Sequence, residues 1–355
     1  MRRILIDKRI AGIANAYKGK VQSHGNYGKD NQLINPQKRL TALLNAFRDG
    51  KVTEYIGKGD DGRKIYKALS GVDSDRYKEY IELIISEYKK DLLTASPAKM
   101  AVLEKRFDAA LGDDALLDKE VKVKSNKSAS FHHIIVSAMM YQEIRQYIYP
   151  QFIRQLGIKS CAYCNAAFCV TDKDGMAYYT ADHWKPKSRY PYLATSFFNL
   201  VPCCFSCNRN KGDDGGEYFC LYEDDKSAKL DVLHLRVPDK NIVEYIMHHN
   251  PEVLNIQLIE ASAAYRSMRD NMDEKLHISN IYAEHKDVAE ETLWRKIAYT
   301  RSNIEALNES LKTSGLSLTS EEVYRFLYGI YPDSDDMHKR PLTRLIQDIM
   351  DDTSW

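Results

Sequence analysis

The sequence predicts a mainly α-helical protein with a small α+β metal-binding module held between two helical regions. Apolar residues recur at three- and four-residue spacing through most of the chain, which is the pattern of amphipathic helices. All seven cysteines, in contrast, lie between residues 161 and 220. A metal site in the middle of a helical chain explains both observations, and we expect three parts: 1–130, 131–220 and 221–355.

The first part is expected to begin with a basic arm or loosely packed segment over 1–36, where Gly and Asn are frequent. Helical periodicity begins at Pro36, and Ser96-Pro97 is a typical helix start with proline at the first helical position. Residues 112–130 are polar and are the best candidate for a boundary. The helices expected in this part cover 62–70, 75–94 and 97–111.

The second part should begin with one amphipathic helix over 132–156, with Pro150 as a candidate break, that leads into the cysteine region. The third part is expected to contain short strands at 218–222 and 253–259 and then to be helical. Its predicted helices cover 261–275, 286–313, 319–330 and 341–351.

Composition places the chain among cytoplasmic proteins with reduced thiols. It is 44% hydrophobic and 28% charged, and no apolar run approaches the roughly 20 residues of a membrane helix. An acid, Asp7, interrupts the short apolar patch at the start, so this segment does not resemble a secretory signal. Paired cysteines in such a protein indicate a metal or catalysis more often than disulfides.

Positive charge is unevenly distributed although the net charge is only +1. Residues 1–39 carry nine Lys or Arg against two acids, and Lys122, Lys124 and Lys127 form a second basic patch before the cysteines. Basic segments of this kind often neutralise phosphates. A solvated terminus with no partner explains the first of them equally well.

Two Cys-x-x-Cys pairs separated by 39 residues have the spacing of a tetrahedral zinc site. Four thiolates select zinc over harder cations and leave no open position, so this zinc is expected to be structural. Cys203 is a rival for the third ligand, but it gives a poorer spacing to the fourth. The predicted ligands are Cys161, Cys164, Cys204 and Cys207.

Between the cysteine pairs lie residues suited to phosphodiester hydrolysis. His183 is a natural general base near neutral pH, and Asp182 beside it offers a hard oxygen to Mg²⁺. Asn199 and Asn208 can supply amide oxygens, either to orient the histidine or to complete a metal shell. Cations suited to phosphate oxygens surround these positions: Lys187, Arg189, Arg209 and Lys211.

The run from Asp182-His183, through Asn199, to Cys204-x-x-Cys207-Asn208-x-x-Lys211-Gly212 resembles an HNH endonuclease. The resemblance covers about 55 residues. It implies a ββα-metal fold, in which a two-stranded hairpin and a helix clasp one divalent cation, and it favours DNA as substrate, with RNA as the alternative.

Carried over by position, the resemblance implies that His183 is the general base and Asp182 a metal ligand. Asn199 matches the Asn that fixes the base loop, and Asn208 takes the place of a second metal ligand. That last position departs from the common His, and a neutral oxygen there favours Mg²⁺ or Mn²⁺.

Flanking segments extend the resemblance to an HNH subgroup of bacterial antiphage defence, as in Septu-type and retron-associated systems, which often accompanies an ATPase. These segments begin at Tyr190, Tyr282 and His338. The chain itself has no Gly-x-x-x-x-Gly-Lys-Ser/Thr motif, so ATP-dependent control would come from a co-encoded ATPase. The alternative to an endonuclease is a non-catalytic zinc module that binds nucleic acid and serves as an adaptor for such an ATPase.

Overall fold

The computed structural model describes residues 1–27, 33–124 and 126–352, and it confirms a mainly helical chain with small strand pairs. The α-helices of this part of the chain are α1 (Lys8–Ser23), α2 (Pro36–Arg48), α3 (Gly71–Lys89), α4 (Pro97–Leu111), α5 (Ala115–Asp118), α6 (Phe131–Ala138), α7 (Tyr141–Tyr147), α8 (Tyr149–Leu156), α9 (Phe205–Lys211), α10 (Asp239–His248), α11 (Arg266–Leu276), α12 (Ile278–Ala283), α13 (Lys286–Ala298), α14 (Arg301–Thr313), α15 (Ser320–Tyr328) and α16 (Thr343–Asp351).

The strands are short and form small separate sheets. They are β1 (Ile4–Leu5), β2 (Asn26–Tyr27), β3 (Leu33–Ile34), β4 (Val52–Lys58), β5 (Lys64–Ala68), β6 (Glu120–Val123), β7 (Ala129–Ser130), β8 (Thr180–His183), β9 (Leu200–Cys203), β10 (Tyr222–Glu223), β11 (Leu233–Arg236) and β12 (Gln257–Glu260). The largest described sheet has the order β5-β4-β6-β7, and two-stranded pairs join β1 to β10, β2 to β3, β8 to β9, and β11 to β12.

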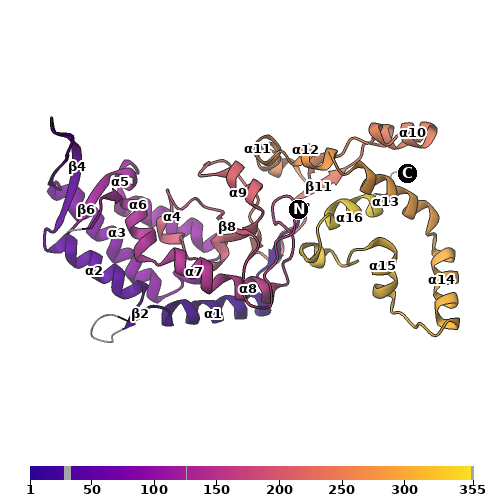
Figure 1. Ribbon diagram of the computed structural model, residues 1–355, viewed down its shortest axis with the longest axis horizontal. Coiled ribbons are helices and arrows are strands. Elements are labelled where there is room, and N and C mark those ends of the chain that lie inside the picture. The colour runs from indigo at the N-terminus through magenta and orange to yellow at the C-terminus, as the bar shows by residue number, and fades with distance from the viewer. Residues whose placement is uncertain (28–32, 125, 353–355) are drawn as a thin grey trace.

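From α2 onward the elements follow the long axis of the molecule approximately in chain order, whereas the N-terminus and α1 lie near the middle (Figure 1). Helices α2 and α3 lie at one end with β4 and β6, β8 and α9 lie in the middle, and α10 and α13 to α15 occupy the other end. One hydrophobic core runs through the first two regions and into the third, whereas a smaller cluster around Val323 and Leu327 lies on α15. Within the described residues, no helix is both long and apolar enough to cross a membrane.

The sequence-predicted start and stop of α4 are confirmed. Ser96 caps the helix by accepting a hydrogen bond from the Lys99 amide (3.4 Å), and Pro97 occupies the first turn. Gly112 ends the helix in a left-handed conformation with φ 72°, which a residue without Cβ adopts at little cost.

The expectation of a loose arm over 1–36 is wrong for most of that segment. Residues 8–23 form α1, whose Tyr17 is fully buried against the rings of Phe152 and Phe197, at centroid distances of 5.5 and 5.1 Å. The basic residues of this helix led to the expectation of a loose arm, although its apolar residues have helical spacing and form one face. Residues 28–32, which belong to the predicted arm, lie outside the described residues.

The helix predicted over 62–70 is also wrong, because this segment contains β5 in a hairpin with β4. The pair of rings at Tyr55 and Tyr66, 6.0 Å apart across the hairpin, shows why aromatic residues favour strand pairing here. Residues 112–130 contribute β6 and β7 to the same sheet and are thus not a simple polar linker.

The long helix predicted over 132–156 is divided into α6, α7 and α8. Met140 has a left-handed backbone conformation with φ 57°, which interrupts the helical hydrogen-bond ladder between the first two. The segment predicted as one helix over 286–313 is likewise divided between α13 and α14.

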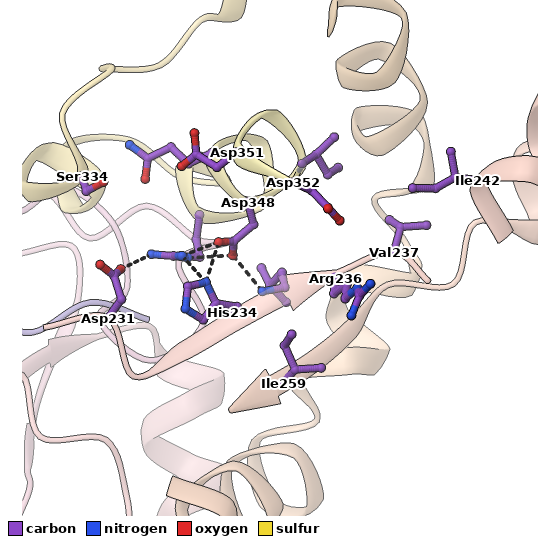
Figure 2. A pocket seen from close by; sticks show the side chains of 14 residues that line it. Asp231, His234, Arg236, Val237, Ile242, Ile259, Ser334, Asp348, Asp351 and Asp352 are labelled. Atoms are coloured by element: carbon purple, nitrogen blue, oxygen red, sulfur yellow. Dashed lines mark hydrogen bonds and ion pairs between the residues drawn. The ribbon is translucent and has the colours of Figure 1, made fainter. Parts of the chain in front are cut away.

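Helix α16 is held against β11 by a buried ion-pair network, beside a cavity of about 440 Å³ (Figure 2). The Arg344 guanidinium pairs with Asp231 and with both carboxylate oxygens of Asp348, where Nε lies 2.7 Å from Oδ2. Asp348 also accepts hydrogen bonds from the Leu235 amide and from the His234 ring, both at 2.8 Å. Arg344, Asp231 and Asp348 therefore neutralise one another and hold α16 in place.

Replacing Arg344 by alanine is expected to lower the free energy of unfolding by about 3–5 kcal/mol, because two carboxylates lose a buried partner. The Arg344 and Asp348 side chains are only 6% and 7% exposed. A urea titration measures the loss. Arg236→Ala, which removes an exposed cation paired with Asp239, should change stability by less than about 0.5 kcal/mol; equal effects of the two variants would contradict the prediction.

Acid should weaken the same network. Burial opposes ionisation of Asp348, but the His234 hydrogen bond and the Arg344 charge outweigh it and hold the pKa of Asp348 below its ordinary value. The ionised carboxylate thus stabilises the fold above about pH 4, and this contribution is lost as pH falls through the lowered pKa.

Candidate active site

The four predicted cysteines meet at the start of α9. Their sulfur atoms all lie within 4.8 Å of one another, and Cys204 caps α9 with its Sγ 3.5 Å from the amide of Cys207. Zinc–thiolate bonds of about 2.3 Å require sulfurs roughly 3.8 Å apart, so the cluster fits a tetrahedral ion. Cys204 and not Cys203 joins the other three sulfurs, because Cys203 ends β9 and its Sγ contacts the Thr180 hydroxyl at 3.4 Å.

Two of the flanking segments that extend the resemblance, those that begin at Tyr282 and His338, pack against the first cysteine pair. Tyr282 donates a hydrogen bond to the carbonyl of Cys164 (2.8 Å). Asn165, which has a left-handed backbone with φ 54°, accepts hydrogen bonds from the amides of Leu342 (2.7 Å, at its carbonyl) and Arg344 (2.9 Å, at its side chain). These distant residues support the turn that presents two of the thiolates.

Strands β8 and β9 form an antiparallel hairpin in which Asp182 pairs with Val201 and His183 with Leu200, and α9 follows directly. This is the two-strand-and-helix module that the sequence predicts. It places Asp182 and His183 at the end of β8, beside the first turn of the loop that leads to β9.

His183 is oriented through one ring nitrogen. Its Nε2 lies 3.0 Å from the carbonyl oxygen of Ala194, and because a carbonyl only accepts hydrogen bonds, Nε2 carries the proton. Burial, reinforced by the charges of Lys187 and Lys211, lowers the pKa of His183 to about 3. The imidazole is therefore neutral at pH 7, with a lone pair on Nδ1.

Asp182 is buried between a phenol and an ammonium group. The Tyr163 hydroxyl donates to its Oδ2 at 2.6 Å, and Lys211 Nζ lies 3.1 Å from the same oxygen. Burial raises the pKa of Asp182 above its ordinary value, although Lys211 and Tyr163 oppose the rise. The carboxylate is thus already held in place by charge and hydrogen bonding.

Lys211 occupies a different position from the one expected of a nucleic-acid contact. It is only 2% exposed, and its ammonium group donates to the His183 carbonyl at 2.8 Å as well as pairing with Asp182. A cation enclosed in this way cannot meet a nucleic acid at the surface. Its position at the end of α9 instead ties the helix to the strand that carries Asp182 and His183.

Asn199 fixes the loop after His183. Its side-chain oxygen accepts a hydrogen bond from the Lys185 amide (2.8 Å), and its side-chain nitrogen donates to the carbonyls of Lys185 (3.1 Å) and Leu193 (3.2 Å). The residue is fully buried. The loop is held from outside as well, since Glu104 of α4 binds Lys185 and Tyr190, each at 2.6 Å.

Replacing Asn199 by alanine is expected to lower the free energy of unfolding by about 1–3 kcal/mol for each buried backbone group that stays unsatisfied. The His183 ring should lose part of its orientation as well, because Leu193 directly precedes Ala194, the hydrogen-bond acceptor of His183. Thermal unfolding measures the first effect. Asn280→Ala, on the exposed face of α12, is the matched control and should leave stability within about 0.5 kcal/mol; a loss of the same size there would contradict the assignment.

Five of the predicted residues line one pocket of about 400 Å³: Asp182, His183, Lys187, Asn208 and Arg209. Arg189 lies outside it, lines a neighbouring cavity and pairs with Asp114.

The sequence interpretation missed the opposite wall, to which α7 contributes Tyr141, Gln142 and Arg145. Tyr141 donates to the Ala181 carbonyl (3.1 Å), and its ring lies 4.7 Å from that of His183. Only the break before α7 allows this approach, and the sequence pattern did not reveal that break.

Comparison with known proteins agrees with this geometry. Residues 161–214 match the family model described as HNH endonuclease. The chain is also similar to the Septu protein PtuB of Bacillus thuringiensis, with 28% identity in an alignment that covers 24% of this chain and 40% of that protein. No solved structure matches the chain. Residues 161–214 are thus an HNH endonuclease domain with a four-cysteine cluster, in a chain distantly homologous to PtuB.

Proposed function

We propose that this protein hydrolyses phosphodiester bonds of nucleic acid, with DNA as the favoured substrate and a divalent cation as cofactor. The observation that carries the proposal is the pocket in which a neutral, oriented His183 lies beside the Asp182 carboxylate and the cations Lys187 and Arg209. Hydrolysis needs a base for water and positive charge at the scissile phosphate, and this pocket supplies both.

His183 acts as the general base in this proposal. Because Nε2–H is engaged by the Ala194 carbonyl, Nδ1 is the atom that accepts the proton from the attacking water. The Tyr141 ring and the loop held by Asn199 fix the plane of the imidazole. The charge that develops on the phosphate is stabilised by Lys187 and Arg209.

Asp182 and Asn208 would hold Mg²⁺ or Mn²⁺, since both line the pocket and offer a carboxylate and an amide oxygen. When bound, such a cation supplies Lewis-acid stabilisation of the phosphate and of the leaving oxygen. Lys211 balances the charge of Asp182 and keeps the carboxylate in position.

Cys161, Cys164, Cys204 and Cys207 would hold a structural Zn²⁺, because their four sulfurs already converge and leave no coordination position for substrate. We propose the same partition of the chain as the sequence suggests: a nuclease module at 131–220 between helical regions at 1–130 and 221–355.

The decisive experiment offers plasmid DNA, single-stranded DNA and total RNA to the purified protein with Mg²⁺ or Mn²⁺. The proposal is supported if cutting stops when the added cation is chelated while zinc is retained. The substrate that is cut then shows whether the enzyme acts on DNA or RNA. Cutting of RNA alone would establish an RNA-cleaving effector. Binding of all three without cutting, in the presence of either cation, would contradict the enzyme and favour a nucleic-acid-binding adaptor.

We further propose that the nuclease is the effector of a bacterial antiphage system and acts with a co-encoded ATPase. The similarity to the Septu protein PtuB supports this role. The test is phage plating on cells that carry the operon with wild-type protein or His183→Ala, together with co-purification of the ATPase. Equal plaque numbers with and without the wild-type operon, and no retained ATPase, would contradict the proposal.

A further inference from the structure

A second cationic cavity, of about 410 Å³, lies between α2, α6 and the connection from β6 to β7. Its rim carries Arg39, Lys124 and Lys127, together with the polar side chains of Asn126 and His133. The floor is apolar and built from small or branched side chains: Ala42, Leu43, Ala46, Val123, Ile134 and Ala138. Among the described residues that line it there is no carboxylate.

This combination matches the chemistry of one nucleotide. A base has apolar faces and polar edges, whereas its phosphate is an anion that Lys and Arg neutralise. The cavity at Arg344 is unlike it, because four aspartates line that cavity. Lys124 and Lys127 are exposed at the rim and form no ion pair with any residue that the structure describes.

The rim is held in place by its backbone. Lys124 has a left-handed conformation with φ 54°, and its amide donates to the Lys51 carbonyl at 2.9 Å. The Asn126 amide donates to the Val123 carbonyl at 3.1 Å. Lys124 and Asn126 of the rim are thus each held by a backbone hydrogen bond.

The cavity adjoins the catalytic pocket. Helix α6 carries His133 and Ser137 of the cavity, and after one turn of chain α7 begins with Tyr141 and Gln142 of the pocket. Arg39 of the cavity lies 3.7 Å from Glu143 on α7, the helix that carries Tyr141 and Gln142 of the pocket. The charge of Lys187, which lines the catalytic pocket, is among the causes that lower the pKa of His133, after burial and His132.

We propose that this cavity binds a nucleotide of the same strand that the catalytic pocket cleaves, with its phosphate at Lys124 and Lys127 and its base on the apolar floor. The inference rests on the proposed nuclease function and adds where the substrate strand runs. It also gives a role to Lys124 and Lys127 of the basic patch, which do not line the catalytic pocket.

The first test measures binding of a fluorescent oligonucleotide, single-stranded or duplex, to His183→Ala protein between about 50 and 200 mM salt. Removing both lysines (Lys124→Ala with Lys127→Ala) should reduce the slope of log K against log salt by about 0.7 for a single strand or 0.9 for a duplex, because the contact with one phosphate is lost. The matched control removes Lys240 and Lys312, exposed on α10 and α14 at the far end of the molecule (Figure 1), and should leave the slope unchanged.

A second variant tests the floor without altering charge. Ala42 is exposed on α2 and lines the cavity, so Ala42→Leu should narrow the space for a base and weaken binding while the salt slope stays the same. Steady-state cleavage by the same variants in the active protein should show a raised KM with little change in kcat.

The outcomes separate the two proposals. Wild-type cleavage together with an unchanged slope and KM in the lysine variant would overturn the nucleotide site and leave the nuclease standing. A reduced slope in a protein that cuts no substrate would support the site and contradict the nuclease. Unchanged binding by Ala42→Leu would overturn the placement of a base on the floor.

Discussion

Replacing His183 by alanine is expected to slow phosphodiester cleavage by about 10²- to 10⁴-fold, the usual contribution of a general base. The effect should fall on the chemical step, since His183 is 4% exposed and in the proposed mechanism acts only on the attacking water. Single-turnover cleavage of a labelled oligonucleotide measures it. Binding of the uncut oligonucleotide should stay close to that of the wild type.

The matched control is His248→Ala, which removes an exposed histidine from the last turn of α10. Its cleavage rate should equal that of the wild type. The zinc content of both variants must be measured, because loss of zinc would imitate loss of the base. An equal drop in both variants would show that the defect lies in the fold and not at His183.

The second large effect is expected for Cys204→Ser, which removes one of the four convergent sulfurs. Structural zinc supplies about 10–16 kcal/mol in small zinc-binding peptides at pH 7, so loss of a thiolate should release the ion and unfold the module. The damage should spread, because Cys204 also begins α9, and α9 carries Asn208, Arg209 and Lys211. Zinc stoichiometry and the thermal unfolding temperature are the measurements.

Cys220→Ser is the control for this change. Cys220 is 5% exposed and donates to the carbonyl of Tyr222 at 3.3 Å, a bond that a serine hydroxyl can replace. This variant should keep its full zinc content and most of its stability. A Cys204→Ser protein that retains zinc and melts at the wild-type temperature would rule out the four-sulfur site.

The cysteine cluster was predictable because it depends on local chemistry, whereas the hairpin was expected from the resemblance to an HNH endonuclease. Two cysteines at i and i+3 form a turn that presents both thiolates, so spacing alone identifies Cys161, Cys164, Cys204 and Cys207. Helix α4 was equally predictable, since Ser96, Pro97 and Gly112 act within the chain segment that they delimit.

The missed features depend on contacts between distant segments. Tyr17 belongs to the segment predicted as a basic arm, and its burial depends on contacts with Phe152 and Phe197, which are distant in the sequence. Lys211 was expected to be a surface cation because it follows Asn208 in the motif. Only the folded hairpin of β8 and β9 brings Asp182 to its ammonium group. Propensity carries no information about such pairings.

The break between α6 and α7 was missed for a different reason. Residues 132–156 keep helical periodicity across Met140, so the pattern indicates one helix although the backbone turns there. That turn brings Tyr141 to His183 and sets Ser137 on the neighbouring cavity. The sequence could therefore identify the residues of the β-hairpin side of the site but not the helix that forms its other wall.

The most direct test of His183 as the base is chemical rescue of the His183→Ala protein by added imidazole. The account predicts that cleavage by the zinc-loaded variant is slow, that imidazole restores part of the rate, and that imidazole leaves the wild-type rate unchanged. Restoration should follow the neutral form of imidazole as pH is raised, because only that form accepts a proton. A zinc-loaded His183→Ala protein that cuts at the wild-type rate without imidazole would contradict the account.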